Sequence, residues 1–191
     1  VIYSTNFGKG GGDADLSITA FLVDRCEKVY VAGWGGGINI AERYPNAGTS
    51  GLPVTSNPVP IRATTDGSDF YFFVLEKNAS SQLYGTFYGN IDPAGDVGDH
   101  VDGGTSRFDK EGIIYEAICA NCGQVGTFNT TPGVWGPRNL ANSGGKCNEA
   151  AVKIAFELAG VGSAVQSSIN GVPRDTSGCL PLTVDFRDTI G

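Results

Sequence analysis

Three features of the sequence predict an all-β fold built from repeated antiparallel sheets. Short apolar runs are separated by turn-forming stretches that hold many of the 29 Gly and 9 Pro residues, as in proteins with many strands and many turns. No segment of useful length carries apolar residues at helical spacing. The chain also repeats itself in tandem, and its 40% hydrophobic residues are far more than an unfolded chain carries.

The repeat is defined by three pairs of segments that match in collinear order. These pairs are residues 2–8 with 83–89, 27–32 with 112–117, and 69–76 with 150–157. The middle pair has a slightly different offset, which insertions of a few residues explain. Three collinear matches are hard to obtain by chance, so the sequence contains two copies of one structural unit.

The first unit is predicted to contain four strands. A turn at residues 24–27 joins the first two strands, and a long loop rich in Gly, Pro, Asn and Ser follows at residues 35–65. The third strand is almost wholly apolar, as expected of a strand that is buried on both faces. The expected strands are residues 17–23, 29–33, 70–75 and 83–88.

The second unit repeats this order over residues 105–108, 113–118 and 152–156, but a fourth strand is missing. After Leu158 the composition becomes that of a linker. Conversely, residues 1–7 match a fourth strand with no first three before it. We therefore expect them to complete a sheet upstream, in a longer protein of which this sequence is a fragment.

Tandem units of four short antiparallel strands are typical of β-propeller blades. Two blades cannot close a ring and leave long edges exposed, so we expect further blades in the full protein. We assign residues 1–160 to part of a β-propeller and residues 161–176 to a linker. Residues 177–191 are predicted to open an immunoglobulin-like β-sandwich, because Val184 and Phe186 alternate with polar neighbours.

Charge and hydropathy exclude several classes of partner. The formal net charge is -7 and the chain contains no run of Lys or Arg, so we expect no binding to nucleic acid or to an anionic membrane surface. No apolar stretch approaches the roughly 18 residues of a membrane-spanning helix, so we expect no membrane insertion.

Five cysteines raise the question of disulfides or metal binding. A pair spaced as Cys119-x-x-Cys122 would suggest metal or redox chemistry in a cytosolic protein, but no thioredoxin-like pattern surrounds it. We favour disulfides over free thiols and over a zinc site, because the other features are typical of extracellular proteins. The candidates are Cys26, Cys119, Cys122 and Cys147, and their pairing does not follow from the sequence.

Several of these segments resemble a known family. Residues 2–8, 20–36 and 83–89 resemble the SBBP-type β-propeller repeats of secreted bacterial proteins. Residues 98–109 resemble a segment of large surface proteins exported by the type IX secretion route, in which a propeller precedes polycystic-kidney-disease-like (PKD) domains. Residues 178–186 resemble the opening of such a PKD domain. The resemblance implies an extracellular location at the bacterial surface, and roles in adhesion, gliding or surface appendages.

Acidic loops and the single His are the candidate polar sites. Asp96, Asp99 and Asp102 lie in a Gly-containing loop, and oxygen-rich loops suit calcium, although solvated carboxylates are the simpler interpretation. The spacing matches no EF-hand. His100 has Asp neighbours as a general base would, but no nucleophile motif accompanies it, so we expect a structural role.

Exposed aromatic residues and one short motif complete the candidates. Trp135 and Tyr44 fall in or beside Gly-rich loops, where an aromatic ring can stack on a sugar or anchor a partner subunit. Trp34 directly follows a strand, so packing in the core is expected for it. Residues 188–190 resemble the short O-glycosylation motif of bacteria with type IX secretion, which makes Thr189 a candidate modification site.

We therefore expect a non-enzymatic, secreted structural or adhesive protein of the bacterial surface, with other surface subunits and copies of itself as partners. Such a protein could belong to a filament or appendage used in adhesion, gliding or contact with prey or substrate. No cofactor is expected apart from the calcium considered above. The alternative is a carbohydrate-binding module or polysaccharide hydrolase that uses the propeller face, and a hydrolase would need two carboxylates converging on one pocket.

Overall fold

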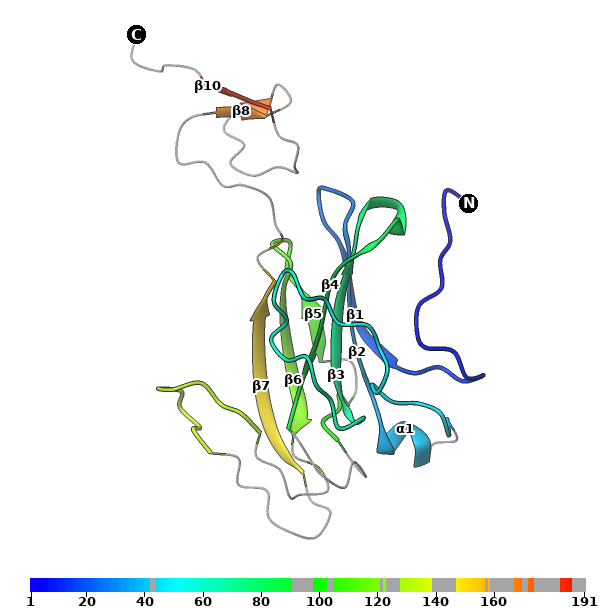
Figure 1. Cartoon of the computed structure of the whole chain (residues 1–191). Helices are drawn as coiled ribbons and strands as arrows, with labels where there is room; N and C mark the ends of the chain where they lie inside the picture. Colours follow the sequence, from blue (N-terminus) through cyan, green and yellow to red (C-terminus); the bar gives the residue numbers. More distant parts are fainter. Residues whose placement is uncertain are drawn as a thin grey trace.

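The computed structural model in Figure 1 is an all-β protein with almost no helix. It describes residues 1–41, 44–90, 98–102, 105–120, 122, 128–138, 147–156, 158, 167–169, 172–173 and 183–186. The all-β prediction is confirmed. The chain forms one four-stranded and one three-stranded antiparallel sheet, and a further small sheet follows near the C-terminal end of the chain.

The first sheet contains β1 (Ser17–Val23), β2 (Val29–Gly35), β3 (Asp69–Leu75) and β4 (Gln82–Tyr88), in that spatial order. Each strand pairs antiparallel with the next, and all four lie where the sequence predicted a strand. The β1–β2 turn is held by Asp24, whose carboxylate accepts the backbone N–H groups of Cys26 and Lys28 at 2.8 and 2.9 Å. A short helix, α1 (Gly37–Ala41), follows β2, and a 3-10 turn, η1 (Lys77–Ala79), joins β3 to β4.

The second sheet contains β5 (Ser106–Phe108), β6 (Ile113–Ala120) and β7 (Asn148–Ala155), in the order β5-β6-β7. All three strands overlap predicted ones, although β7 begins at Asn148, ahead of the predicted start at Val152. Within the described ranges, no strand pairs with the free edge of β7, where the first sheet has β4. The repeat is therefore visible in the topology, with the second copy one strand short.

The small sheet near the C-terminal end contains β8 (Ser167–Ile169), β9 (Val172–Pro173) and β10 (Val184–Phe186), in the order β10-β8-β9. β10 lies where the first strand of a sandwich was expected. β8 and β9 fall in the segment that was expected to be a linker, and they form strands there because they pair with each other and with β10. Figure 1 shows this sheet apart from the two larger ones.

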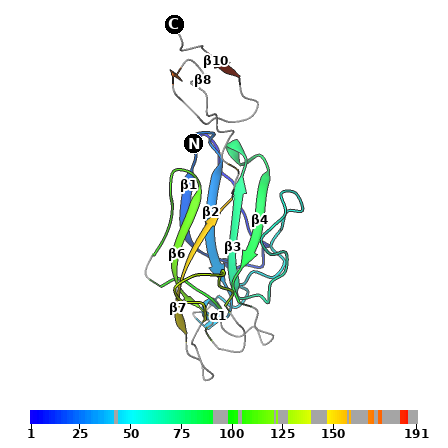
Figure 2. The ribbon, with the colours of Figure 1, turned by 90° about the vertical axis from the view of Figure 1, so that its left-hand side faces the viewer.

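The two larger sheets lie against each other, as Figures 1 and 2 show. Alternate residues of each sheet point into a shared core, because side chains of a strand alternate between its faces. Phe72 of β3 and Ile114 of β6 are both fully buried in it. Phe156, directly after β7, lies at its centre, with its ring centroid 5.5 Å from that of Tyr84 and 5.8 Å from that of Phe72.

The outer face of the first sheet is also covered, which explains why β3 is buried on both faces. The loop between α1 and β3 packs Leu52 against Tyr71 and Phe73 in a second apolar cluster. The same loop also pairs with the edge of β4, where the backbone N–H of Phe87 donates to the backbone carbonyl of Arg62 at 3.0 Å. The guanidinium of Arg62 forms an ion pair with the buried carboxylate of Asp69. The loop therefore covers the outer edge of β4, which no other described strand of the sheet occupies.

Residues 1–7 were expected to complete a sheet upstream of this sequence, and within this chain they pair with no described strand. Every residue of this segment is exposed, and its one ring contact within the described structure joins Phe7 to Phe73 at 4.9 Å. A strand exists only through hydrogen bonds to a neighbouring strand. No described strand of this chain pairs with this segment.

Gly89, at the end of β4, is required by its surroundings. Its φ of 149° is a conformation that residues with a side chain rarely adopt. A Cβ at this position would lie 2.6 Å from Asp69 Oδ1 and 2.6 Å from Asp99 Oδ2. Both carboxylates are buried and cannot move aside into solvent.

We predict that Gly89→Ala lowers the free energy of unfolding by roughly 1–3 kcal/mol, because the added methyl group overpacks this point. Urea unfolding followed by tryptophan fluorescence measures the change. Gly136→Ala is the matched control, since a Cβ at Gly136 meets no atom within 4 Å. Equal stability of the two variants would contradict the packing argument.

Candidate functional site

Three side chains with metal-binding or catalytic chemistry meet at the end of β6. His100 and Asp102 come from the segment before β5, and Cys119 comes from β6 itself. An isolated antiparallel bridge pairs His100 with Cys119, whose backbone N–H groups donate to each other's carbonyls at 3.1 and 3.0 Å. This pairing continues the β5–β6 ladder and brings two residues far apart in the sequence side by side.

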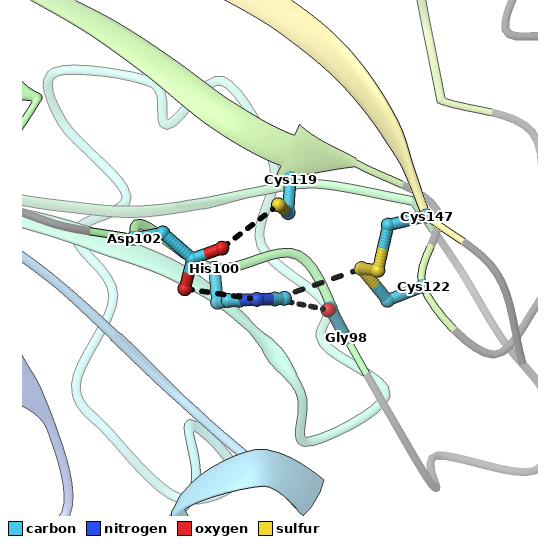
Figure 3. The surroundings of a disulfide bond; sticks show 6 residues. All are labelled: Gly98, His100, Asp102, Cys119, Cys122 and Cys147. Atoms are coloured by element: carbon cyan, nitrogen blue, oxygen red, sulfur yellow. Dashed lines mark hydrogen bonds and ion pairs between the residues drawn. A yellow bond between two sulfur atoms is a disulfide. The ribbon is translucent and has the colours of Figure 1, made fainter.

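The polar atoms of the three side chains lie close together, as Figure 3 shows. The Cys119 thiol donates to Asp102 Oδ2 at 3.1 Å, and His100 Nε2 lies 3.5 Å from Asp102 Oδ1. One ligand atom of each residue lies within 4.8 Å of the others. The His100 side chain is buried, whereas 75% of the Asp102 side chain is exposed, so the cluster is open to solvent on one side.

Contacts with the Gly98 carbonyl and with Trp34 fix the orientation of the His100 ring. Nδ1 lies 3.3 Å from the carbonyl oxygen of Gly98, which accepts a hydrogen bond in the tautomer that carries the proton on Nδ1. The ring also packs against Trp34 of the first sheet at 5.5 Å between centroids. In the neutral tautomer with the proton on Nδ1, the Nε2 lone pair is directed at Asp102.

The Cys119 side chain is a protonated thiol at neutral pH. Burial, the hydrogen bond to Asp102 and the negative charges of Asp102 and Glu149 raise its pKa to about 12. Nucleophilic cysteines instead have a lowered pKa and a base placed to take the proton. Here Asp102 lies between the thiol and His100, so the order of groups does not match a Cys–His–Asp catalytic triad.

A disulfide between Cys122 and Cys147 adjoins the cluster and joins the chain after β6 to the residue before β7. Cys122 Sγ lies 3.6 Å from His100 Nδ1. Cys26 is also disulfide-bonded. Cys119 was a disulfide candidate but is a free thiol. Alternation along β6 explains this, because Cys119 shares the outer face with Ile113, Tyr115 and Ala117, which keeps it away from the buried Cys122.

Of the calcium candidates, Asp99 and Asp102 lie in different surroundings. Asp99 is buried, and its Oδ2 accepts the backbone N–H of Asn90 at 2.6 Å. Asp102 belongs instead to the cluster with His100 and Cys119. Asp96 lies outside the described residues. Across the described chain, Asp99 is in no group of three or more ligand side chains that could hold an ion.

The aromatic candidates lie on the surface. Trp135 is fully exposed in the loop at residues 128–138, and Tyr44 is exposed after α1. Trp34 is buried in the shared core, where the sequence placed it. Thr189, the candidate for O-glycosylation, lies outside the described residues.

Glu116 lines a hollow that β5, β6 and β7 border. It is the only carboxyl group among the described residues of that hollow, whereas glycoside hydrolysis uses two. Its side chain points into the contact between the sheets, and Thr19 of β1 donates to its Oε1 at 3.5 Å. Burial raises the pKa of Glu116 to about 7, against hydrogen bonds from Ser106 and Thr19 that lower it.

The meeting of His100 with Cys119 was not foreseen from the sequence. Residues 98–109 and the Cys-x-x-Cys motif were each noted, but only the strand register joins them. A comparison with protein-family models, curated proteins and solved structures finds no match for this chain. Among the helices of the described part, none has the length and apolar character needed to cross a membrane.

We predict that Glu116→Gln removes a pH dependence of stability. The folded pKa of about 7 exceeds the ordinary 4.5, so the folded protein binds more protons than the unfolded chain. The free energy of unfolding therefore falls as pH rises from about 4.5 to about 7 and is level above that. Asp69, whose pKa burial raises to about 6, leaves a smaller slope in the variant.

The expected gain for Glu116→Gln is roughly 1–3 kcal/mol above pH 7 and almost nothing below pH 4.5. Urea unfolding at several pH values measures it. Glu111→Gln is the control, because the Glu111 carboxylate is exposed beside Lys110 and should leave the slope unchanged. The same slope in wild type and Glu116→Gln would show that Glu116 is not the titrating group.

Proposed function

We propose that this chain is a non-enzymatic structural or adhesive module of a secreted bacterial surface protein, in which blade-like sheets stack and chains join by strand addition. One observation carries the proposal. An unpaired segment repeats the sequence of β4, and the second sheet lacks a strand at the position of β4. A protein with a free strand and a matching open edge can assemble with its own kind.

The acceptor is the free edge of β7. β7 corresponds to β3 in the repeat, and β3 pairs on one side with β2 and on the other with β4. β7 pairs with β6 on one side, and no described strand occupies the other. An edge strand of this kind can serve as a template for one more strand.

The donor is the segment of residues 1–7. In the repeat Tyr3 corresponds to Tyr84, which packs on Phe156 at the centre of the core with 5.5 Å between ring centroids. Ile2 is 97% exposed, so its side chain has no neighbours to lose when it moves to a new partner. A second copy of the chain therefore brings a strand of the type that the second sheet lacks.

We also propose that the two larger sheets are neighbouring blades of a β-propeller. A four-stranded and a three-stranded antiparallel meander that share one core match two neighbouring propeller blades, the second one incomplete. The small sheet of β8, β9 and β10 would then open the immunoglobulin-like domain. The sequence resemblance to SBBP repeats and the PKD opening supports this order, and the Cys122–Cys147 disulfide suits an extracellular location.

We predict that Ile2→Asp prevents self-association of the chain. A charge on the added strand would be buried against the partner, whereas at 97% exposure it leaves the monomer's stability within about 0.5 kcal/mol. Light scattering over a range of concentrations should show wild-type oligomers and a monomeric variant. Val59→Asp is the control, because Val59 is 79% exposed on a loop remote in sequence from the donor. Monomeric wild type at every concentration would overturn assembly through this edge.

Glycan binding is the second candidate, and the full exposure of Trp135 favours it. An indole with a free face can stack on a sugar ring, and exposure of this kind is uncommon for Trp. We predict that the wild-type protein binds glycans on an array and that Trp135→Ala abolishes this binding. Val134→Ala, an exposed apolar neighbour without a ring, should retain it. A signal unchanged by Trp135→Ala would exclude this residue as the binding platform.

A further inference from the structure

The cluster of His100, Asp102 and Cys119 takes no part in the strand addition proposed above. Its three side chains offer one nitrogen, one oxygen and one sulfur ligand from the segment before β5 and the end of β6. We infer that these residues form a binding site for a divalent transition-metal ion of the zinc type, with one coordination position open to solvent.

The distances between the ligand atoms suit one ion. Zinc binds His nitrogen, carboxylate oxygen and thiolate sulfur at about 2.0 to 2.3 Å in tetrahedral geometry, which separates neighbouring ligand atoms by about 3.3–3.6 Å. Here Asp102 Oδ2 lies 3.1 Å from Cys119 Sγ, and Asp102 Oδ1 lies 3.5 Å from His100 Nε2. One ligand atom of each residue lies within 4.8 Å of the others, and side-chain rotation on binding would direct all three at a common centre.

The surroundings of His100 prepare it as a ligand. The Gly98 carbonyl accepts from Nδ1, and this kind of partner orients metal-binding imidazoles in proteins. In the tautomer with the proton on Nδ1, the Nε2 lone pair faces the carboxylate oxygen of Asp102 at 3.5 Å, and both groups are acceptors. A cation between them satisfies both, and the packing of the ring on Trp34 prevents it from turning away.

The ligand types select the ion. Calcium prefers six to eight oxygen ligands, which this mixed set does not offer, whereas zinc accepts nitrogen, oxygen and sulfur together. When the ion binds, the Cys119 thiol releases its proton to solvent and the sulfur forms the bond to the metal. Glu149 lies opposite Cys119 across the β6–β7 ladder and adds a negative charge to the same rim. The bound ion would tie the segment before β5 to β6.

Cobalt(II) is the probe of choice, because its bond to a thiolate absorbs in the near ultraviolet. The protein is treated with a chelator without any reductant, so that the Cys122–Cys147 disulfide stays intact. We expect added Co²⁺ to give this absorbance at one equivalent and excess Zn²⁺ to remove it. We also expect Zn²⁺ to slow alkylation of the Cys119 thiol in the unmodified protein, a measurement that needs no variant.

Two variants locate the site. Cys119→Ser should abolish the thiolate absorbance. Asp102→Asn should weaken Co²⁺ binding at least about tenfold, the lower end of the loss seen when even an outer partner of a metal ligand is removed. Asp102 is mostly exposed, so this variant keeps the fold. Glu111→Gln, an exposed carboxylate near the opposite end of β6, should bind as the wild type does.

Absence of the thiolate absorbance and of Zn²⁺ protection in the wild type would overturn the inference. Co²⁺ absorbance that survives in both Cys119→Ser and Asp102→Asn would overturn it as well, because the ion would then bind elsewhere. Neither result bears on self-association through β7, since the cluster and the strand-adding edge involve different residues. The metal site and the proposed assembly are therefore tested separately.

Discussion

The packing of the two sheets against each other determines most of this structure, and Phe156 lies at the centre of that contact. Its ring centroid lies 6.4 Å from Tyr30, 5.8 Å from Phe72, 5.5 Å from Tyr84 and 6.1 Å from Phe108. Three of these rings belong to the first sheet and one to the second. Burial of one such side chain stabilises a fold by about 1.5–3 kcal/mol, and the aromatic contacts add to that. The relative position of the sheets follows from this packing.

That position in turn creates the cluster at the end of β6. His100 lies between Trp34 of the first sheet and the Cys122–Cys147 disulfide of the second, so its ring is held from two sides. The bridge to Cys119 then sets the thiol and Asp102 in front of Nε2. A reactive cysteine would need a lowered pKa, and this environment raises it. The arrangement suits the holding of an ion better than nucleophilic attack.

The edge strand β4 of the first sheet is covered by a loop, whereas no described strand occupies the free side of the edge strand β7 of the second sheet. This difference matters for assembly. The β4 edge is covered by the loop that carries Arg62, whose carbonyl accepts from Phe87. No described strand pairs with the outer edge of β7. Proteins usually protect such edges, because an open strand pairs readily with another chain. An open β7 and an unpaired segment with the sequence of β4 are what strand addition between chains requires.

The amino-acid sequence by itself determined the strands and their repetition. Alternating and continuous apolar runs such as β6 and β3 depend on the two-residue period of a strand, which is a local property. Only the tertiary structure decided that His100 meets Cys119, since this depends on which strand lies next to which. Cys119 shows the same limit: the extracellular character of the sequence favoured a disulfide, but the face of β6 on which the side chain lies left it a free thiol. Pairing and register are set by long-range packing, and no local pattern encodes them.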